Sequence, residues 1–256
     1  MKHWGRMLKA FPWAALSCWA FADVAAQQAG DNLVPNGGFE IITKDPVTFD
    51  QIGRATGWGN VTLGMAELFA GTATAKTVGI PQNAYGSMEP KEGGHYAGFM
   101  AWKDDQRRDY DRGPDDPFKP GWNVYSEYPW IELATTLKEG HVYEVSFWVA
   151  LAGNSDRAIA GLGAFLSPLE LNYPNRAFLK ERPQVVEDKV LEERGKWVQV
   201  KGTFTADGDE RYLVIGTFPT AIFDTKRIVE GYDNQYAYYY LDNVSVREVS
   251  TENAVD

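Results

Sequence analysis

The stretch HVYEVSFWVAL, residues 141–151, contains the clearest strand of the sequence and decides its fold class. Apolar residues occupy every second position, which is the period of a β-strand with one face toward a core. The inward positions are Tyr143, Val145, Phe147, Val149 and Leu151. The opposite face carries Glu144, Ser146, Trp148 and Ala150. Residues 130–133 alternate in the same way, and the turn formers at 138–140 predict a turn between the two strands.

Short runs of this kind, separated by Gly, Pro, Asn and Asp, continue through the rest of the chain. They predict further strands at 159–166, 197–205, 212–218 and 238–246. Residues 184–193 are the one plausible helical stretch, but their charge favours a surface loop. The number and spacing of strands predict an all-β, two-sheet sandwich. We expect one domain over residues 27–250, with a long polar loop at 103–122 and a tail at 251–256.

The N-terminal segment has the layout of a secretory signal peptide, which we place at residues 1–26. Lys2, Arg6 and Lys9 precede a short apolar run, and small residues follow it as a cleavage site. The run is too short to cross a bilayer. We therefore expect an exported protein in the periplasm, on the outer-membrane surface or outside the cell. A lipid anchor at Cys18 is the less favoured interpretation, because the apolar run before it would be very short.

Cysteine and charge counts restrict the function further. Cys18 is the only cysteine, so cleavage would leave a domain held by its core or by metal ions. The whole chain has 25 basic and 35 acidic residues; removing residues 1–26 leaves 22 and 34, a net charge of −12. This charge disfavours nucleic acid and anionic membranes as partners. No other hydrophobic segment is long enough to be transmembrane.

Four stretches of the sequence resemble a known family. NLVPNGGFE (32–40) and YAYYYLDNVSV (236–246) look like the two ends of galactose-binding-like jelly rolls, which include many carbohydrate-binding modules. Residues 126–167 and 183–218 are similar to a jelly-roll module of Bacteroidota cell-envelope proteins, which often precedes an OmpA-like or a sorting domain. The resemblance implies a galactose-binding-domain-like jelly roll. Neither appended domain occurs in this sequence, so attachment to peptidoglycan is not implied.

The resemblance also implies a structural calcium ion. In jelly rolls of the carbohydrate-binding type, the glutamate of the Phe-Glu pair and the aspartate of the last strand commonly ligate Ca²⁺, and here these are Glu40 and Asp242. Carboxylate oxygens are the ligands that Ca²⁺ prefers, and such a site would join the two ends of the chain. The alternative is that Glu40 caps a turn and Asp242 belongs to the Asp-Asn turn at a strand end.

Catalytic motifs are weak. Only His95 and His141 follow the predicted signal peptide, which makes a zinc site or a serine-histidine triad improbable. A glycosidase needs two suitably placed carboxylates, and with this many acidic residues some such pair is inevitable. An enzyme is therefore not expected, and a glycoside-active one is the least supported alternative.

Aromatic residues give the most specific binding hypothesis. If the apolar faces of the two alternating strands point to the core, Trp130 and Trp148 both point outward. They could form a platform for sugar rings, with hydrogen-bonding partners and further aromatic rings around them. The partners are Glu132, Glu144 and Ser146, and the rim is Trp102, Trp122, Tyr125 and Tyr128. Alternatively, these rings lie under the long loop as a satellite core.

From the sequence we predict a secreted, non-catalytic carbohydrate-binding-type module of the bacterial cell envelope or surface. The alternative is a structural or adhesive subunit of an envelope or extracellular assembly, in which the partner is a protein instead of a glycan.

Overall fold

The computed structural model describes residue 1 and residues 30–104, 124–229 and 236–249. The predicted signal peptide with Cys18, most of the predicted loop 103–122 including Trp122, and the predicted tail 251–256 lie outside the described residues. Among the residues that the structure does describe, no helix is long and apolar enough to cross a membrane.

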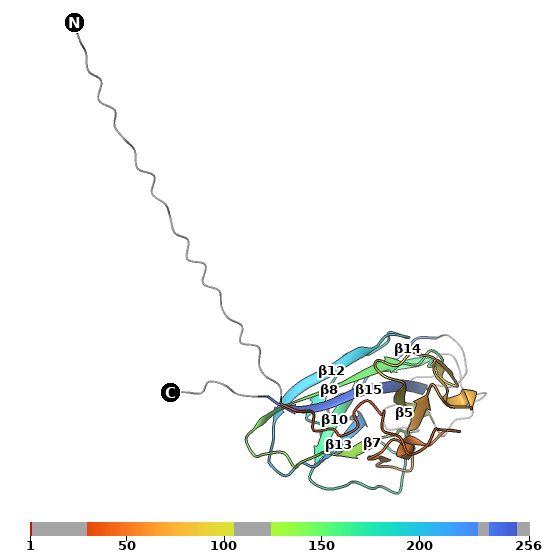
Figure 1. Ribbon diagram of the computed structural model, residues 1–256, viewed down its shortest axis with the longest axis horizontal. Helices are drawn as coiled ribbons and strands as arrows, with labels where there is room; N and C mark the ends of the chain where they lie inside the picture. The colour runs from red at the N-terminus through yellow and green to blue at the C-terminus, as the bar shows by residue number, and fades with distance from the viewer. Residues whose placement is uncertain (2–29, 105–123, 230–235, 250–256) are drawn as a thin grey trace.

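The chain forms a β-sandwich of two large antiparallel sheets, as predicted (Figure 1). The five-stranded sheet has the order β1-β7-β13-β10-β11, and its strands are β1 (Trp58–Asn60), β7 (Pro129–Glu132), β13 (Tyr212–Thr217), β10 (Leu162–Ser167) and β11 (Val185–Val186). The six-stranded sheet has the order β12-β8-β15-β5-β2, with β6 paired to β5. Its strands are β12 (Val198–Thr205), β8 (Val142–Leu151), β15 (Tyr236–Glu248), β5 (His95–Asp104), β2 (Glu67–Ala70) and β6 (Val124–Tyr125).

Smaller elements complete the described part of the chain. Two short antiparallel pairs join β3 (Gln82–Asn83) to β4 (Gly86–Ser87), and β9 (Arg157–Ile159) to β14 (Thr225–Arg227). The 3-10 helices η1 (Ile52–Arg54) and η2 (Lys76–Val78) lie before β1 and before β3. The charged stretch 184–193 contains β11 and is otherwise irregular, in agreement with the predicted loop.

Alternation along the strands builds the core between the two sheets. In β8, Val145, Phe147 and Val149 point inward and are buried, as the sequence predicted. The predicted strand 159–166 is instead divided into β9 and β10. Gly161 separates them with φ +89, and a Cβ atom there would lie 2.2 Å from the Ile222 carbonyl oxygen, so the chain turns where no side chain fits.

The segment 32–40 lies beside the last strand, β15. The Asn32 side chain binds the Val244 carbonyl oxygen and the Val246 amide. Gly37 accepts a hydrogen bond from the Val244 amide, and a Cβ on Gly37 would lie 2.0 Å from the Val244 carbonyl oxygen. Gly37 therefore permits a close approach that a residue with a side chain would block.

A second apolar cluster covers the outer face of the six-stranded sheet, and we call it the outer aromatic layer. Tyr239 and Leu241 of β15 point into the core, so the alternating Tyr238 and Tyr240 point outward. The layer consists of Phe69, Val78, Met88, Tyr96, Met100, Ala150, Ala152, Tyr236, Tyr238 and Tyr240. The segment between β2 and β5 contributes Val78 and Met88, so this connection covers part of the sheet.

Candidate functional site

Two glutamates are buried together at the edge of the outer aromatic layer. Glu67 is the first residue of β2 and is 2% exposed, and Glu127 follows β6 and is 3% exposed. Because Leu68 belongs to the core between the sheets, its neighbour Glu67 points to the outer face. Burying two carboxylates is costly unless hydrogen bonds or charges compensate, so this pair indicates a specialised site.

Tyrosine hydroxyls and one backbone amide bind all four oxygens of the two glutamates. Tyr238 donates to Glu67 Oε2 over 2.6 Å, and Tyr85 donates to Glu67 Oε1 over 3.2 Å. Tyr125 donates to Glu127 Oε1 over 2.6 Å, and the Met100 amide donates to Glu127 Oε2 over 2.7 Å. A carboxyl group that accepts at both oxygens is supplied with donors as an ionised carboxylate would be.

Burial opposes that ionised form. Burial, and then repulsion from Glu127, raise the pKa of Glu67 well above its ordinary value. Burial likewise raises the pKa of Glu127 to about 7, against the lowering effect of the hydrogen bonds from Tyr125 and Met100. The two glutamates therefore compete with each other for negative charge at neutral pH.

The glutamates line an open pocket of about 300 Å³, which we call the Glu67–Glu127 pocket. Its remaining lining residues come from five segments of the chain and are Phe49, Asp50, Tyr85, Met100, Lys103, Tyr125 and Arg176. Phe49 meets Tyr85 edge to face at 5.8 Å, and Tyr85 stacks on Tyr238 at 3.6 Å. The Arg176 guanidinium lies 5.4 Å from the centre of the Tyr125 ring. Aromatic walls with a few convergent polar groups are typical of small-ligand sites.

Trp130 and Trp148 do not form a common platform, contrary to the sequence-based hypothesis. Their strands β7 and β8 follow each other in the chain but belong to different sheets. Ile131 and Phe147 both point into the core between the sheets, so the two tryptophans point to opposite outer faces of the sandwich. Alternation alone shows which side of a strand faces outward, but it does not show to which sheet the strand belongs.

The polar partners separate in the same way. Glu132 is with Trp130 on the five-stranded sheet and forms a 2.5 Å salt bridge with Arg211. Glu144 and Ser146 share the outer face of the six-stranded sheet with Trp148, and Glu144 pairs with Lys201 at 2.6 Å. The Lys91 ammonium lies 4.3 Å from the centre of the Trp148 ring, so this ring is already covered in part by the chain itself.

The expected rim residues are also dispersed. Trp102 is buried in the core between the sheets, and Tyr128 is buried in a separate apolar cluster, so neither ring belongs to an exposed rim. Most of the loop 103–122 lies outside the described residues, so the alternative that the rings lie under it stays a prediction. The Tyr128 hydroxyl donates to the Thr217 carbonyl oxygen over 2.5 Å and accepts from the Leu179 amide. Of the described members of the predicted set, Tyr125 lines the Glu67–Glu127 pocket.

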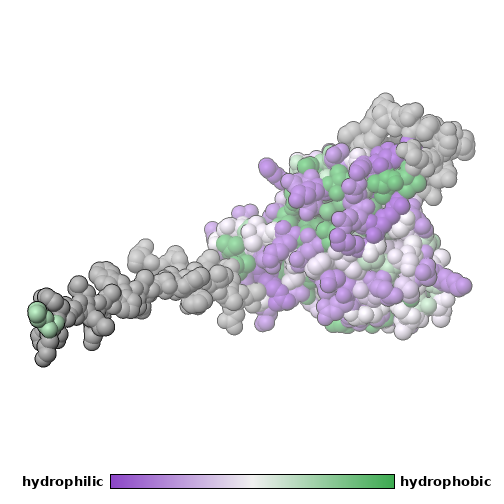
Figure 2. Space-filling view, turned by 90° about the horizontal axis from the view of Figure 1, so that it is seen from above, coloured by the Kyte–Doolittle hydropathy of each residue, from purple (hydrophilic) through white to green (hydrophobic). Residues whose placement is uncertain are grey.

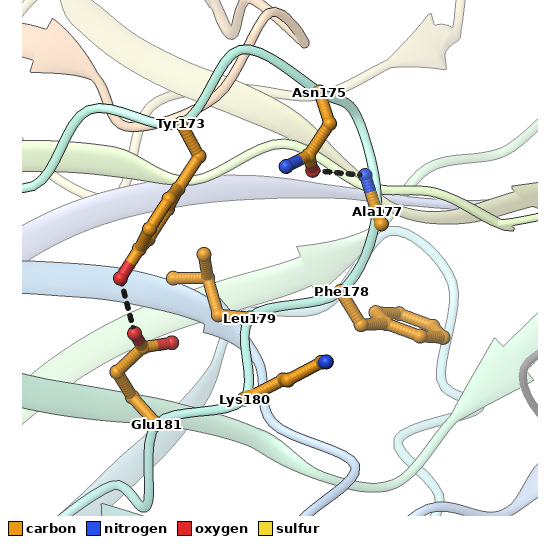
Figure 3. A pocket seen from close by; sticks show the side chains of 7 residues that line it. All are labelled: Tyr173, Asn175, Ala177, Phe178, Leu179, Lys180 and Glu181. Carbon is orange, nitrogen blue, oxygen red and sulfur yellow. Dashed lines mark hydrogen bonds between the residues drawn. The ribbon is translucent and has the colours of Figure 1, made fainter.

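A second pocket of about 410 Å³ lies along residues 173–181, which belong to the connection that leads from β10 to β11 in the chain (Figure 3). The Tyr173 hydroxyl points toward Glu181 and donates to its Oε1 over 2.6 Å, while the Phe178 ring lies at the other side of the pocket. Arg176 belongs to the same segment but its side chain lines the Glu67–Glu127 pocket. One loop thus separates the two pockets, and the second one has a single carboxylate and no deeply buried charge.

Glu40 and Asp242 both accept hydrogen bonds from the segment at the start of β5, residues 91–95. Glu40 Oε1 accepts from the amides of Gly94 and His95, and its Oε2 lies 2.8 Å from His95 Nδ1. Asp242 accepts from the amides of Lys91, Glu92 and Asn243. Burial raises the pKa of Asp242 to about 7, and the nearby Glu40 carboxylate adds to this rise.

The carboxylate oxygens of Glu40 and Asp242 are suitable calcium ligands, but most of their lone-pair positions already accept hydrogen bonds. Each accepts three hydrogen bonds, and a carboxylate offers about four lone-pair positions, so about one position on each remains. Ca²⁺ takes six to eight oxygens, and backbone carbonyls or water would have to supply the others. Within the described ranges, no cluster of three or more His, Cys, Asp or Glu side chains is arranged to hold a metal ion.

Sequence reasoning missed most of the Glu67–Glu127 pocket. The available signal was a charged residue inside an apolar run, as at Glu67 in MAELFAG and Glu127 in VYSEYPW. A glutamate within a short strand is either on a solvent face or buried with partners, and its sequence position does not distinguish these cases. Phe49, Tyr85 and Arg176 come from irregular segments, for which strand patterns give no position.

The molecular surface outside the pockets is mixed. Figure 2 shows hydrophobic residues in several separate patches among hydrophilic ones on the face seen from above. The exposed large hydrophobic side chains of the described domain are Ile41, Val47, Leu63, Met65, Leu169 and Val229. Singly exposed apolar residues are common on soluble proteins and do not define a site.

Comparisons with known proteins give remote structural likenesses. No family model and no curated protein matches the chain. Similar solved structures include a CBM22 xylan-binding domain of Paenibacillus barcinonensis Xyn10C, with 15% identity, a TM-score of 0.44, and coverage of 89% of this chain and 100% of that one. The CBM22-1-GH10 modules of Clostridium thermocellum Xyn10B, complexed with xylohexaose, show 12% identity, a TM-score of 0.41 and coverage of 90% and 30%. The K1 cleaved adhesin domain of Lys-gingipain from Porphyromonas gingivalis shows 13% identity and a TM-score of 0.35, and the match covers 77% of this chain and 92% of that one. Because these identities and TM-scores are low, the likenesses carry no conclusion about function.

Proposed function

We propose that the protein is an exported, non-catalytic glycan-binding module and that the Glu67–Glu127 pocket is its ligand site. The observation that carries the proposal is an open pocket that combines three aromatic walls with two buried, hydrogen-bonded carboxylates. Aromatic rings bind the apolar faces of sugar rings, and carboxylates accept hydrogen bonds from sugar hydroxyls. Lys103 and Arg176 at the mouth add donors for ring or linkage oxygens.

A glycan array followed by titration calorimetry tests this proposal. We expect Tyr125→Ala to weaken binding of the best array ligand at least about tenfold, which corresponds to about 1.4 kcal/mol. Trp148→Ala, on the same sheet but outside the pocket, is the matched control and should bind as the wild type does. Circular dichroism and thermal melting establish that both variants are folded.

The controls separate the possible failures. Binding that is lost in Trp148→Ala but kept in Tyr125→Ala would place the glycan near Trp148 on β8, away from the Glu67–Glu127 pocket. An array without a single bound glycan would contradict the proposed function, and a pull-down from envelope extracts would then test the assembly alternative.

We propose in addition that Ca²⁺ binds between Glu40 and Asp242 and holds the ends of the domain together. Two neighbouring carboxylates, one of them fully buried, support this, because a cation would offset their mutual repulsion. Added Ca²⁺ should raise the melting temperature of the wild type and leave that of Asp242→Ala unchanged. Glu132→Ala, which removes one charge elsewhere, is the control; an equal calcium response in all three proteins would exclude the site.

A glycoside-active enzyme is the second candidate, favoured by one observation. Two carboxyl groups with raised pKa values line one pocket, and a glycosidase requires a protonated and an ionised carboxyl group on either side of the bond. Against it, the oxygens of both groups are bound to tyrosines or to a backbone amide of the fold. Release of reducing ends from the ligand that the array identifies, abolished in Glu127→Gln, would establish catalysis.

A further inference from the structure

The charge distribution of the Glu67–Glu127 pocket points to a particular kind of sugar. Its deepest ionisable residues are the two acidic ones, since Glu67 and Glu127 are almost fully buried. Lys103 is half-buried, and Asp50 and Arg176 are exposed. The two positive charges of the described lining therefore lie at the mouth, together with one further carboxylate. The interior is therefore acidic while the rim is mixed.

Among the residues that the structure describes, the interior has hydrogen-bond donors for two negative charges but no buried positive charge. All four glutamate oxygens receive a donor from Tyr85, Tyr238, Tyr125 or the Met100 amide. Nonetheless burial and mutual repulsion disfavour ionisation of both groups, and the lowering effect of Lys103 on the pKa of Glu127 ranks below those of the two hydrogen bonds. A cation that enters the interior would satisfy both carboxylates at once.

The walls also suit a cation. Aromatic faces attract ammonium and guanidinium groups, and cages of several aromatic rings bind substituted ammonium ions. Phe49, Tyr85 and Tyr125 line the pocket, and Arg176 of the chain itself already rests on the Tyr125 ring at 5.4 Å. Arg176 is exposed, so it covers the mouth without reaching the buried carboxylates.

We infer that the pocket binds glycans with a free, protonated amino group, in which the ammonium group lies between Glu67 and Glu127 against the tyrosine walls. The inference rests on the proposed function and names its ligand class. A neutral hydroxyl or an acetamido group can donate a hydrogen bond to one carboxylate, but neither offsets the second negative charge. The discrimination therefore depends on one substituent of the sugar ring.

Three β-1,4-linked oligosaccharides of equal length test this substituent, because they differ only at carbon 2. Chitosan oligomers have an amine there, chitin oligomers an acetamide and cello-oligomers a hydroxyl. We expect calorimetry to show at least about tenfold tighter binding of the chitosan oligomer. We also expect proton release on binding at about pH 6, measured in two buffers of different ionisation enthalpy, because the sugar amine is already protonated there while Glu127, with a pKa of about 7, still holds the proton that the ammonium group replaces.

Glutamine variants separate the pocket from the general acidity of the chain, which has a net charge of −10. Glu67→Gln and Glu127→Gln should each abolish the preference for the amine. Glu132→Gln removes the same charge from the other sheet and should keep it. An equal loss in all three variants would mean attraction by net charge and would overturn the inference.

The remaining outcomes distinguish this inference from the proposed function. If the acetamide or the hydroxyl oligomer binds as tightly as the amine, the inference is wrong while glycan binding stands. Binding of an unrelated glycan on the array, without any response to the three oligomers, has the same meaning. An array without binding overturns both.

Discussion

Replacing Glu127 by glutamine should change how the stability of the domain depends on pH. In the folded protein burial raises the pKa of Glu127 from its ordinary value of 4.5 to about 7. Below about pH 4.5 the residue is protonated in both states and contributes no pH dependence. As the pH rises toward 7, the unfolded chain releases the proton while the folded one keeps it, so stability falls.

The size of this loss follows from the pKa values. A rise from 4.5 to about 7 corresponds to about 3 kcal/mol, which is reached once the pH exceeds the folded-state pKa. Glutamine cannot ionise, but its oxygen can still accept from the Met100 amide and its amide can donate to the Tyr125 hydroxyl. Relative to the wild type, the variant should therefore gain about 3 kcal/mol between about pH 4.5 and about pH 8.

Urea unfolding followed by tryptophan fluorescence measures this difference at a series of pH values. A chelator in every buffer removes any calcium contribution at Asp242. Glu132→Gln is the surface control and should differ from the wild type by no more than about 0.5 kcal/mol at either end of the range. Parallel curves for Glu127→Gln and the wild type would refute the reasoning, because they would show that Glu127 does not hold a proton in the folded state.

Two further predictions concern a buried hydrogen bond and a close packing contact. Tyr238→Phe removes the hydroxyl that binds Glu67 over 2.6 Å in a fully buried position, and should lower the free energy of unfolding by about 1.5–3 kcal/mol, measured in urea. Gly216→Ala places a Cβ atom 2.2 Å from the Tyr128 ring and should lower the free energy of unfolding by about 1–3 kcal/mol. Gly53→Ala is the control and should lower it less, because its Cβ atom would lie 4.0 Å from the nearest heavy atom. Equal melting temperatures for the two alanine variants would contradict the packing argument.

Strand alternation was sufficient to predict the sandwich. The alternating residues of 141–151 place Phe147 in the core, and the tyrosines of 236–246 alternate between core and outer layer. The resemblance of residues 32–40 and 236–246 to the ends of a jelly roll implied one site with Glu40 and Asp242; both carboxylates accept hydrogen bonds from residues 91–95, and calcium binding there stays a prediction. These features depend on local periodicity or on contacts between two recognisable segments.

The binding hypothesis failed where it depended on sheet membership. A turn at 138–140 can join two strands of one sheet or lead from one sheet to the other, and the sequence is compatible with both. The chain crosses between sheets here, so Trp130 and Trp148 are separated by the core. The Glu67–Glu127 pocket was not predicted because it combines irregular segments with strands that are distant in the sequence.

The position of Asp242 relative to the pocket has a consequence for how binding and stability are linked. Tyr238 and Asp242 lie on the same outward face of β15, four residues apart, which is about 13 Å along a strand. Between them β15 is paired with β8 on one side and with β5 on the other, so the intervening backbone is held on both edges. We therefore expect the backbone of β15 to transmit little of a change at Asp242 to Tyr238 and Glu67. Accordingly, we expect the proposed calcium ion to affect the closure of the domain, and the proposed ligand choice to depend on the Glu67–Glu127 pocket.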